Sequence, residues 1–253
     1  MIKQIYYTLL DLVTFKKGIP VTVNGFNLRL PARYYKYFPK TYEKENFEFY
    51  KKHSKKGMTV LDIGAHFGLF AVFFQKNTDG VVYAFEPTKN TLGVLKETVA
   101  INKCQDKIHI VEMAVDKEPG SANFFVNKTV GGRGNTLVKD AKLGMTSSSY
   151  LVEVTSVDVF VKEKGIEVDC IKIDAEGAEL GVLKGAANTI LKNRPVILLS
   201  IHPEPIQSRG DTLNEIWNLL EQYRYKVLLD DKEMSESDFS GANHLFDVHL
   251  IPR

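Results

Sequence analysis

The sequence contains few cysteines, one tryptophan and almost no net charge. Its two cysteines, Cys104 and Cys170, are too few for a disulfide framework. Cys170 lies in an apolar run, where a buried free thiol is expected. The combined cysteine and histidine spacing of a zinc site is missing, so we predict no bound metal. A net charge of +2 argues against a protein dedicated to nucleic-acid binding.

Long apolar runs are also missing. The N-terminal stretch has an amphipathic helical pattern that Asp11 interrupts, and this stretch is too short to span a bilayer. Its apolar positions are Ile2, Ile5, Tyr6, Leu9, Leu10 and Val13. No small-residue cleavage site follows, so we predict no signal peptide. We expect a cytoplasmic protein whose first helix packs on the core, and contact of that helix with a membrane surface is the less favoured alternative.

The apolar pattern alternates between strands and helices along the chain. Apolar runs typical of buried strands occupy residues 58–63, 81–86, 108–115, 169–174 and 195–201. Helical patterns occupy residues 67–76, 89–101, 155–164, 178–192 and 211–223. This alternation predicts an α/β fold with a doubly wound, Rossmann-like sheet that is mostly parallel.

We predict an N-terminal extension followed by one larger domain. Residues 1–57 form the extension, a helix and a hairpin, because alternating residues flank Asn24-Gly25, the favoured pair of a type I′ turn. Residues 58–253 form the main domain. Residues 116–154 interrupt the alternation of strands and helices with two short strand patterns around a glycine-rich segment at 131–134. We therefore predict a hairpin insertion here that covers a ligand.

The most informative segment runs from Val60 to Gly68, with the sequence VLDIGAHFG. It predicts a strand, a loop and a helix start, and its glycines follow Gly-x-x-x-Gly rather than Gly-x-Gly-x-x-Gly. The carboxylate of Asp62 would repel a pyrophosphate and attract a cationic ligand such as S-adenosylmethionine. Asp62 could instead cap the helix. The expected cofactor contacts in this segment are Asp62, Gly64, Ala65, His66 and Gly68.

A second acid stands at the end of the next predicted strand. Glu86, followed by Pro87, comes 24 positions after Asp62. An acid there can accept hydrogen bonds from both ribose hydroxyls, although Glu86 could instead cap the following helix. At the end of the third strand, Met113 and Ala114 could hold an adenine or pack against the sheet. These residues complete the predicted cofactor site.

Three acids and a histidine follow the fourth and fifth predicted strands. The acids Asp174, Glu176 and Glu179 lie within six residues, and His202 follows the fifth strand. Methyl transfer to a hydroxyl needs a base, and His202 is the first candidate. Glu176 or Glu179 would orient the acceptor or the imidazole, and Asp174 would lie at the cofactor edge. Two alternatives remain: acids that complement a helix dipole beside a structural histidine, and an acid cluster that holds Mg²⁺.

Together these motifs resemble the FkbM-type methyltransferases over residues 58–202. The resemblance rests on VLDIGAHFG, on FEP at 85–87 and most specifically on IKIDAEGAE at 171–179, followed by VLKGA. It implies a class I S-adenosylmethionine-dependent fold, usually of seven strands with the last antiparallel. It also implies O-methylation, commonly of sugar or natural-product hydroxyls. By position it assigns to the cofactor site, or to its junction with the substrate, Asp62, Gly64, Gly68, Glu86 and Asp174.

The chain departs from the family pattern at two positions. His66 stands where the family often has asparagine, which leaves the contacts to the methionine part of the cofactor open. Ser200 stands where the family often has glutamate, so an acidic role at that point does not carry over. The resemblance also does not identify the acceptor, because the family acts on many; a small molecule or a glycan is expected.

Three other classes of function compete with this interpretation. A nicotinamide-dependent oxidoreductase or nucleotide-sugar enzyme is disfavoured by Asp62 and by the missing Gly-x-Gly-x-x-Gly motif. A methyltransferase for another acceptor class is a nearer rival. The base-modifying type would show asparagine or aspartate, two prolines and an aromatic residue where this chain has DAEG at 174–177. A non-catalytic binding module is the third class, and an intact cofactor site argues against it.

Overall fold

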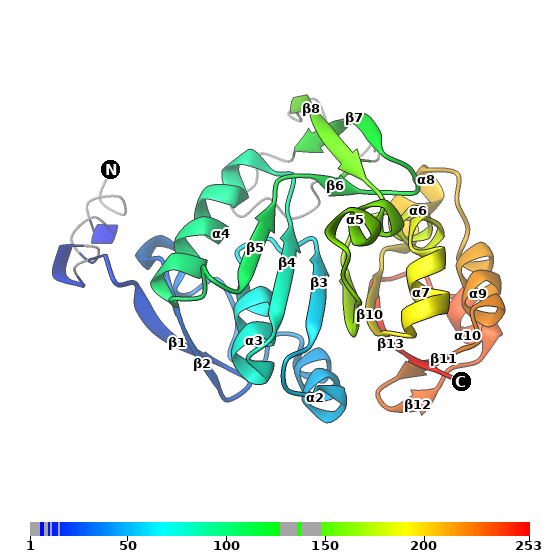
Figure 1. Cartoon of the computed structure of the whole chain (residues 1–253), viewed down its shortest axis with the longest axis horizontal. Coiled ribbons are helices and arrows are strands. Elements are labelled where there is room, and N and C mark those ends of the chain that lie inside the picture. The colour runs from blue at the N-terminus through cyan, green and yellow to red at the C-terminus, as the bar shows by residue number, and fades with distance from the viewer. Residues whose placement is uncertain (1–5, 8–9, 11, 15, 127–135, 138–147) are drawn as a thin grey trace.

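One eight-stranded sheet lies at the centre of the computed structural model, which describes residues 6–7, 10, 12–14, 16–126, 136–137 and 148–253 (Figure 1). Its strands follow one another across the sheet in the order β12 (Lys232–Glu233), β11 (Tyr225–Leu229), β13 (Phe246–Pro252), β10 (Val196–Ile201), β9 (Cys170–Ile173), β3 (Thr59–Ile63), β4 (Val81–Phe85) and β5 (Ile108–Val111). The strands from β10 to β5 are parallel, and β13 is antiparallel to both β10 and β11. The predicted doubly wound α/β fold with an antiparallel last strand is confirmed.

The strand order reverses between β3 and β9. From β3 the chain adds β4 and β5 on one side, and it then returns to add β9 and β10 on the other side. In open α/β sheets, a crevice forms beyond the carboxyl ends of the strands at such a reversal. Asp62 and Lys172 are Cα partners in the pairing of β3 with β9, so the reversal places an acid and a base side by side.

The third predicted strand is shorter than expected. It ends at Val111 rather than at residue 115, and Ala114–Val115 instead form β6. β6 belongs to a separate sheet with β8 (Ser148–Thr155), to which it is parallel, and β7 (Gly120–Val126), which pairs antiparallel with β8. The apolar run of the sequence continues through this change of partner, so its periodicity does not mark the break.

The predicted hairpin insertion is confirmed by the antiparallel pairing of β7 with β8. Figure 1 shows these two strands at the top of the view, beyond the carboxyl ends of β4 and β5. Phe124 of β7 lines the cavity that is described below. The predicted glycine-rich segment at 131–134 lies outside the described residues.

Helices cover both faces of the central sheet. Successive strand residues point to opposite faces, so Leu61 packs in one apolar cluster and Val60 in the other. The first cluster contains residues of α5 (Val157–Lys164), α6 (Glu179–Gly185), α7 (Ala187–Asn193), α8 (Pro203–Ser208), α9 (Leu213–Gln222) and α10 (Glu236–Ser240). The second contains residues of α2 (Lys44–His53), α3 (Leu69–Thr78) and α4 (Lys89–Ile101). Burial on both faces explains the nearly continuous apolar strands.

The N-terminal extension packs against the second cluster. Its hairpin, β1 (Ile19–Val23) and β2 (Phe26–Leu30), turns at Asn24 and Gly25 with φ of 49° and 74°, as a type I′ turn requires. A short 3₁₀ helix, η1 (Ala32–Tyr34), follows. The predicted first helix lies partly outside the described residues, and its Tyr6 and Val13 are 48% and 75% exposed, so the predicted core packing is wrong for these two. None of the described helices is long and apolar enough to cross a membrane.

Two predicted helices differ from the structure. The helix predicted for 178–192 is interrupted at Ala186, between α6 and α7. α6 passes so close to the segment after β6 that a Cβ on Gly185 would lie 2.4 Å from the carbonyl oxygen of Asp116. The helix predicted for 155–164 begins later, because Thr155 still belongs to β8, and Ser156 caps it with a hydroxyl that accepts a hydrogen bond from the Val159 amide.

A buried histidine makes the stability of this fold depend on pH. His249 of β13 stacks on Phe49, and its Nε2 lies 2.8 Å from Oδ1 of Asn46. Asn46 Oδ1 can only accept, so Nε2 carries the proton and the buried Nδ1 has no partner among the described residues. Burial lowers the pKa of His249 to about 4. Because the unfolded chain protonates this histidine first, stability is complete above about pH 6.5 and declines as the pH falls toward 4.

We therefore expect His249→Gln to flatten the acid side of the stability profile. Urea unfolding of both proteins from pH 7 to pH 4 should show the wild type losing up to about 3 kcal/mol more than the variant. His244→Gln, at an exposed position nearby, is the matched control and should follow the wild type. Parallel profiles for wild type and His249→Gln would contradict the assignment.

Candidate functional site

A cavity of about 580 Å³ opens beyond the carboxyl ends of the parallel strands. Its size is that of a typical ligand site. One side is formed by residues that follow β3, β4 and β5, and the other by residues that follow β9 and β10. Tyr42, Glu43 and Asp247 close it from the N-terminal extension and β13. The cavity therefore lies at the strand-order reversal, where the fold predicts a ligand.

The loop from β3 to α3 approaches the tip of β9 very closely. Gly64 has φ of 81°, and a Cβ there would lie 2.1 Å from the carbonyl oxygen of Asp174. Gly68 has φ of 82°, and a Cβ there would lie 2.6 Å from Cδ1 of Leu95 on α4. The two glycines of the motif are thus required by close approach and by backbone conformation. His66 between them has φ of 50° and stacks on Phe67 at the cavity edge.

Glu86 ties this loop to the end of β4. Its carboxylate accepts hydrogen bonds from the backbone amides of His66 at 2.8 Å and Thr88 at 2.9 Å. The hydroxyl of Thr91 donates a third, at 3.1 Å. Glu86 is 5% exposed and lines the cavity. A carboxylate offers about four acceptor positions, so one remains for a ligand hydroxyl. The N-cap residue of α4 is Thr88, so Glu86 does not itself cap this helix, although its bonds to Thr88 and Thr91 hold the turn that leads into it.

Asp62 lies beneath the loop rather than on the main cavity wall. β3 continues to Ile63, so the side chain of Asp62 points inward and is fully buried. It lines a small adjoining cavity of about 30 Å³, together with Lys172 and Asp174. Its two carboxylate oxygens have no hydrogen-bond partner among the described residues, and burial raises its pKa to about 7. This is a buried acid aimed at a space beside the ligand cavity.

The structure separates the predicted cofactor residues into three groups. Most of them line the main cavity: Gly64, His66, Glu86, Pro87, Met113, Ala114 and Asp174. Asp62 and Ala65 do not line the main cavity, but both line the small adjoining cavity. Gly68 lines neither cavity, and it is the N-cap residue of α3. Contact of each residue with a cofactor stays a prediction.

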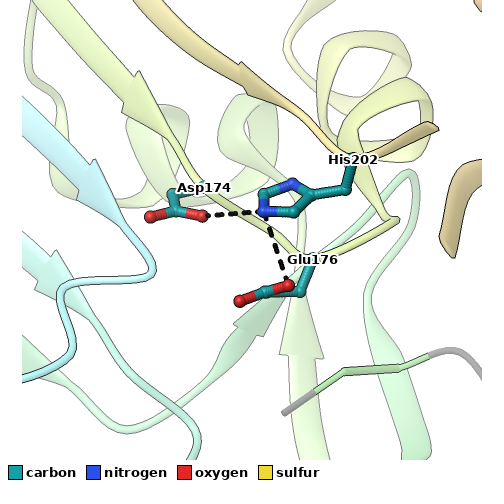
Figure 2. A group of neighbouring side chains, drawn as sticks. All are labelled: Asp174, Glu176 and His202. Carbon is teal, nitrogen blue, oxygen red and sulfur yellow. Dashed lines mark ion pairs between the residues drawn. The ribbon is translucent and has the colours of Figure 1, made fainter. Parts of the chain in front are cut away.

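The predicted catalytic residues converge on one imidazole (Figure 2). Nε2 of His202 lies 3.6 Å from Oδ1 of Asp174 and 3.4 Å from Oε2 of Glu176. Its Nδ1 lies 2.7 Å from Oε1 of Glu179. Asp174 and Glu176 follow β9, His202 follows β10, and the three line the cavity. The sequence therefore grouped these residues correctly.

Glu179 has a different position from its neighbours. It is fully buried at the start of α6, and it also accepts a hydrogen bond from the Gly177 amide at 3.0 Å. It contacts His202 and does not line the cavity, so it does more than complement a helix dipole, and its predicted role in orienting the imidazole stays a prediction. An ionised carboxylate can only accept, so Nδ1 of His202 carries a proton. This fixes Nε2 toward the cavity side.

The acids also determine the charge of His202. Burial lowers its pKa, but the Glu179 hydrogen bond and the charges of Glu179, Asp174 and Glu176 outweigh this effect and raise it to about 10. The imidazole of the ligand-free protein is therefore protonated at neutral pH, and both of its nitrogens carry hydrogen. The role of general base stays a prediction for His202, and it requires that Nε2 first lose its proton.

Sequence reasoning missed a buried cation and two acids. Lys172 is 3% exposed, and its Nζ lies 3.1 Å from Oδ2 of Asp174. A lysine inside the apolar run CIKI was the available signal. Glu43 and Asp247 both accept hydrogen bonds from the amide of Asn46, and burial raises the pKa of each. Neither residue could be predicted from its sequence neighbours, because α2 and β13 are far apart in the sequence and come together only in the folded chain.

Comparison with known proteins identifies the family. Residues 62–227, more than half of the chain, match the family model described as the methyltransferase FkbM domain. The methyltransferase sdnD of Sordaria araneosa is 26% identical over 211 residues, which are 72% of this chain and 78% of the relative. This agrees with the resemblance carried by the strand-end motifs.

A solved structure shares the fold. The crystal structure of a methyltransferase FkbM from Methylobacillus flagellatus KT matches with a TM-score of 0.51 and 15% identity. The match covers 78% of this chain and 44% of that one, so this chain spans less than half the length of the solved protein. The likeness shows the class I, Rossmann-like fold of methyltransferases.

Proposed function

Because this chain belongs to the FkbM family of methyltransferases, we propose that it methylates a hydroxyl group of a sugar, glycan or natural product with S-adenosylmethionine. The observation that carries the proposal is the position of Asp174, Glu176 and His202. These proton-binding groups meet at the strand ends, on the wall of one ligand-sized cavity. A hydroxyl is a weak nucleophile until its proton leaves, so a hydroxyl acceptor explains why such groups are gathered there.

The charges and shape of the cavity fit a cationic, adenine-containing cofactor. Five carboxylates line it, those of Glu43, Glu86, Asp174, Glu176 and Asp247. A sulfonium and an ammonium are favoured beside such acids, whereas a pyrophosphate is repelled. Asp62, buried in the adjoining cavity with no hydrogen-bond partner in the part of the chain that the structure describes, adds to this preference. Apolar side chains at the β5 end of the cavity, including Met113, Val115 and Phe124, suit an adenine ring.

The residues of this chain divide the chemical work between binding and proton removal. Bound S-adenosylmethionine supplies the methyl group, whose bond to sulfur breaks with the electron pair left on sulfur as the acceptor oxygen bonds to carbon. Glu86 would hold the ribose, and the acceptor hydroxyl would lie near the tips of β9 and β10. The hydroxyl proton would be taken up within the cluster of Asp174, Glu176 and His202. Alignment supplies much of the rate of such a transfer.

The direct test is turnover of isotopically labelled S-adenosylmethionine with two matched panels of acceptors. One panel contains monosaccharides and polyhydroxylated natural products, and the other contains their amino analogues. Formation of S-adenosylhomocysteine and of an O-methyl product by mass spectrometry is expected with the first panel. Labelled product from the amines alone would contradict O-methylation. A thermal shift with NAD and none with S-adenosylmethionine would contradict the cofactor.

We expect Glu86→Ala to weaken S-adenosylmethionine binding by about 1.5–3 kcal/mol. The variant removes charge-assisted hydrogen bonds to the ribose and also releases the His66 and Thr88 amides that Glu86 now holds. Calorimetric titration measures the change, and urea unfolding monitors the fold. Glu97→Ala, a partly exposed acid on α4, is the matched control and should bind like the wild type. Unchanged affinity in a folded Glu86→Ala protein would remove Glu86 from the cofactor site.

A further inference from the structure

The side chains of Asp174, Glu176 and His202 are close enough together to hold a metal ion. Each residue offers one ligand atom, and these atoms all lie within 4.8 Å of one another. Ligands at about 2.1 Å from a cation lie about 3–3.5 Å apart at octahedral or tetrahedral angles. The distances from Nε2 of His202 to the two acids, 3.6 Å and 3.4 Å, are close to this range and longer than a good hydrogen bond.

His202 is oriented as metal-bound histidines are. It is 6% exposed, and its Nδ1 contacts the fully buried carboxylate of Glu179 at 2.7 Å. A carboxylate on the far ring nitrogen fixes the tautomer and aims the other nitrogen at a metal. Here that other nitrogen, Nε2, faces the two acids in the cavity wall (Figure 2).

We propose that Asp174, Glu176 and His202 bind one divalent first-row metal cation, such as Mn²⁺, at the tips of β9 and β10. Metal binding at Nε2 releases the proton that His202 carries in the ligand-free protein. The two carboxylates and the neutral imidazole then bring a charge of −2, which a dication neutralises. The mixed nitrogen and oxygen ligands favour Mn²⁺, Fe²⁺ or Zn²⁺ over the all-oxygen preference of Ca²⁺ and Mg²⁺. This replaces our prediction from the sequence that no metal is bound.

The cation gives the cluster a role in the proposed methyl transfer, and this role rests on the proposed function. Its three ligand residues line the cavity, so a cation held by them would be accessible to an acceptor hydroxyl. Coordination lowers the pKa of a bound hydroxyl, so the proton leaves more easily. Asp174 also contacts Lys172, which ties the metal ligand to the central strand.

Binding of Mn²⁺ to the purified full-length chain tests the site without relying on turnover. After treatment with EDTA and its removal, electron paramagnetic resonance measures the loss of the free Mn²⁺ signal as protein is added. One Mn²⁺ per chain is expected. Glu176→Gln should weaken binding more than about 10-fold, because it removes a ligand whose side chain is partly exposed and whose loss leaves the fold intact. Glu179→Gln should weaken it about 10–100-fold through the orientation of His202.

Asp247→Asn is the matched control, because it removes a carboxylate from the same cavity wall outside the cluster. It should bind Mn²⁺ within about 3-fold of the wild type, a small change expected from long-range charge alone. If Asp247→Asn and Glu176→Gln weakened Mn²⁺ binding equally, the cation would be attracted by a diffuse acidic surface, and the proposed site would be wrong. The proposal would also be wrong if the protein bound neither Mn²⁺ nor Zn²⁺. Metal-free protein that still methylates hydroxyls at the full rate would overturn the role of the cation but keep the proposed function.

Discussion

Replacing Lys172 with methionine should lower the free energy of unfolding by about 3–5 kcal/mol. Lys172 is a buried cation, and its ammonium lies 3.1 Å from Oδ2 of Asp174 and 5.2 Å from the centre of the Phe70 ring. Asp62, its fully buried neighbour in register on β3, depends on the same charge. Methionine keeps the apolar stem and removes the charge. The lost free energy of unfolding therefore measures the cost of leaving Asp62 and Asp174 without a cation. Urea unfolding measures it.

Two further variants separate charge from packing. Adding Asp174→Asn to Lys172→Met removes one of the abandoned charges, so the double variant should regain part of the lost stability. Lys107→Met is the matched control on an exposed ion pair with Asp79, and it should cost less than about 1 kcal/mol. If Lys172→Met and Lys107→Met were equally mild, Lys172 would not be the counterion of this buried site.

The sequence predicted the part of the fold that depends on local pattern. Apolar runs gave the five parallel strands, and Asn24-Gly25 gave the hairpin, because strand burial and turn conformation are properties of neighbouring residues. The break after Val111 and the interruption at Ala186 were missed. Both depend on partners far along the chain: β6 joins β8, and Gly185 meets Asp116. Distant partners leave no mark in the period of an apolar run.

The same distinction explains the site. Asp174, Glu176 and His202 were expected together because the carboxyl ends of parallel strands meet at one edge of a sheet. Glu179 was placed with them by sequence distance, yet in the structure it contacts the far side of the imidazole. The pairing of Asp62 with Lys172 follows from strand register, which sequence alone did not specify. Glu43 and Asp247 enter the cavity from two ends of the chain.

Replacing Glu176 with glutamine should reduce turnover on the order of 10²–10⁴-fold and leave S-adenosylmethionine affinity nearly unchanged. Glu176 faces Nε2 of His202 at the cavity wall, on the side away from Glu86 and the predicted ribose contacts. Glutamine keeps the shape but removes the negative charge, so Glu176 can no longer take up the acceptor proton, and a cation bound to the cluster would lose one ligand.

Glu204→Gln is the matched control for this experiment, because it makes the same change at an exposed position on α8, two residues after His202. It should turn over like the wild type. Single-turnover rates and calorimetric affinities for both variants separate the chemical step from cofactor binding. A Glu176→Gln protein with weak cofactor binding and a normal chemical step would move Glu176 into the cofactor site. If the Glu176→Gln protein had wild-type turnover, Glu176 would not take part in proton removal, which would then depend on Asp174 and His202.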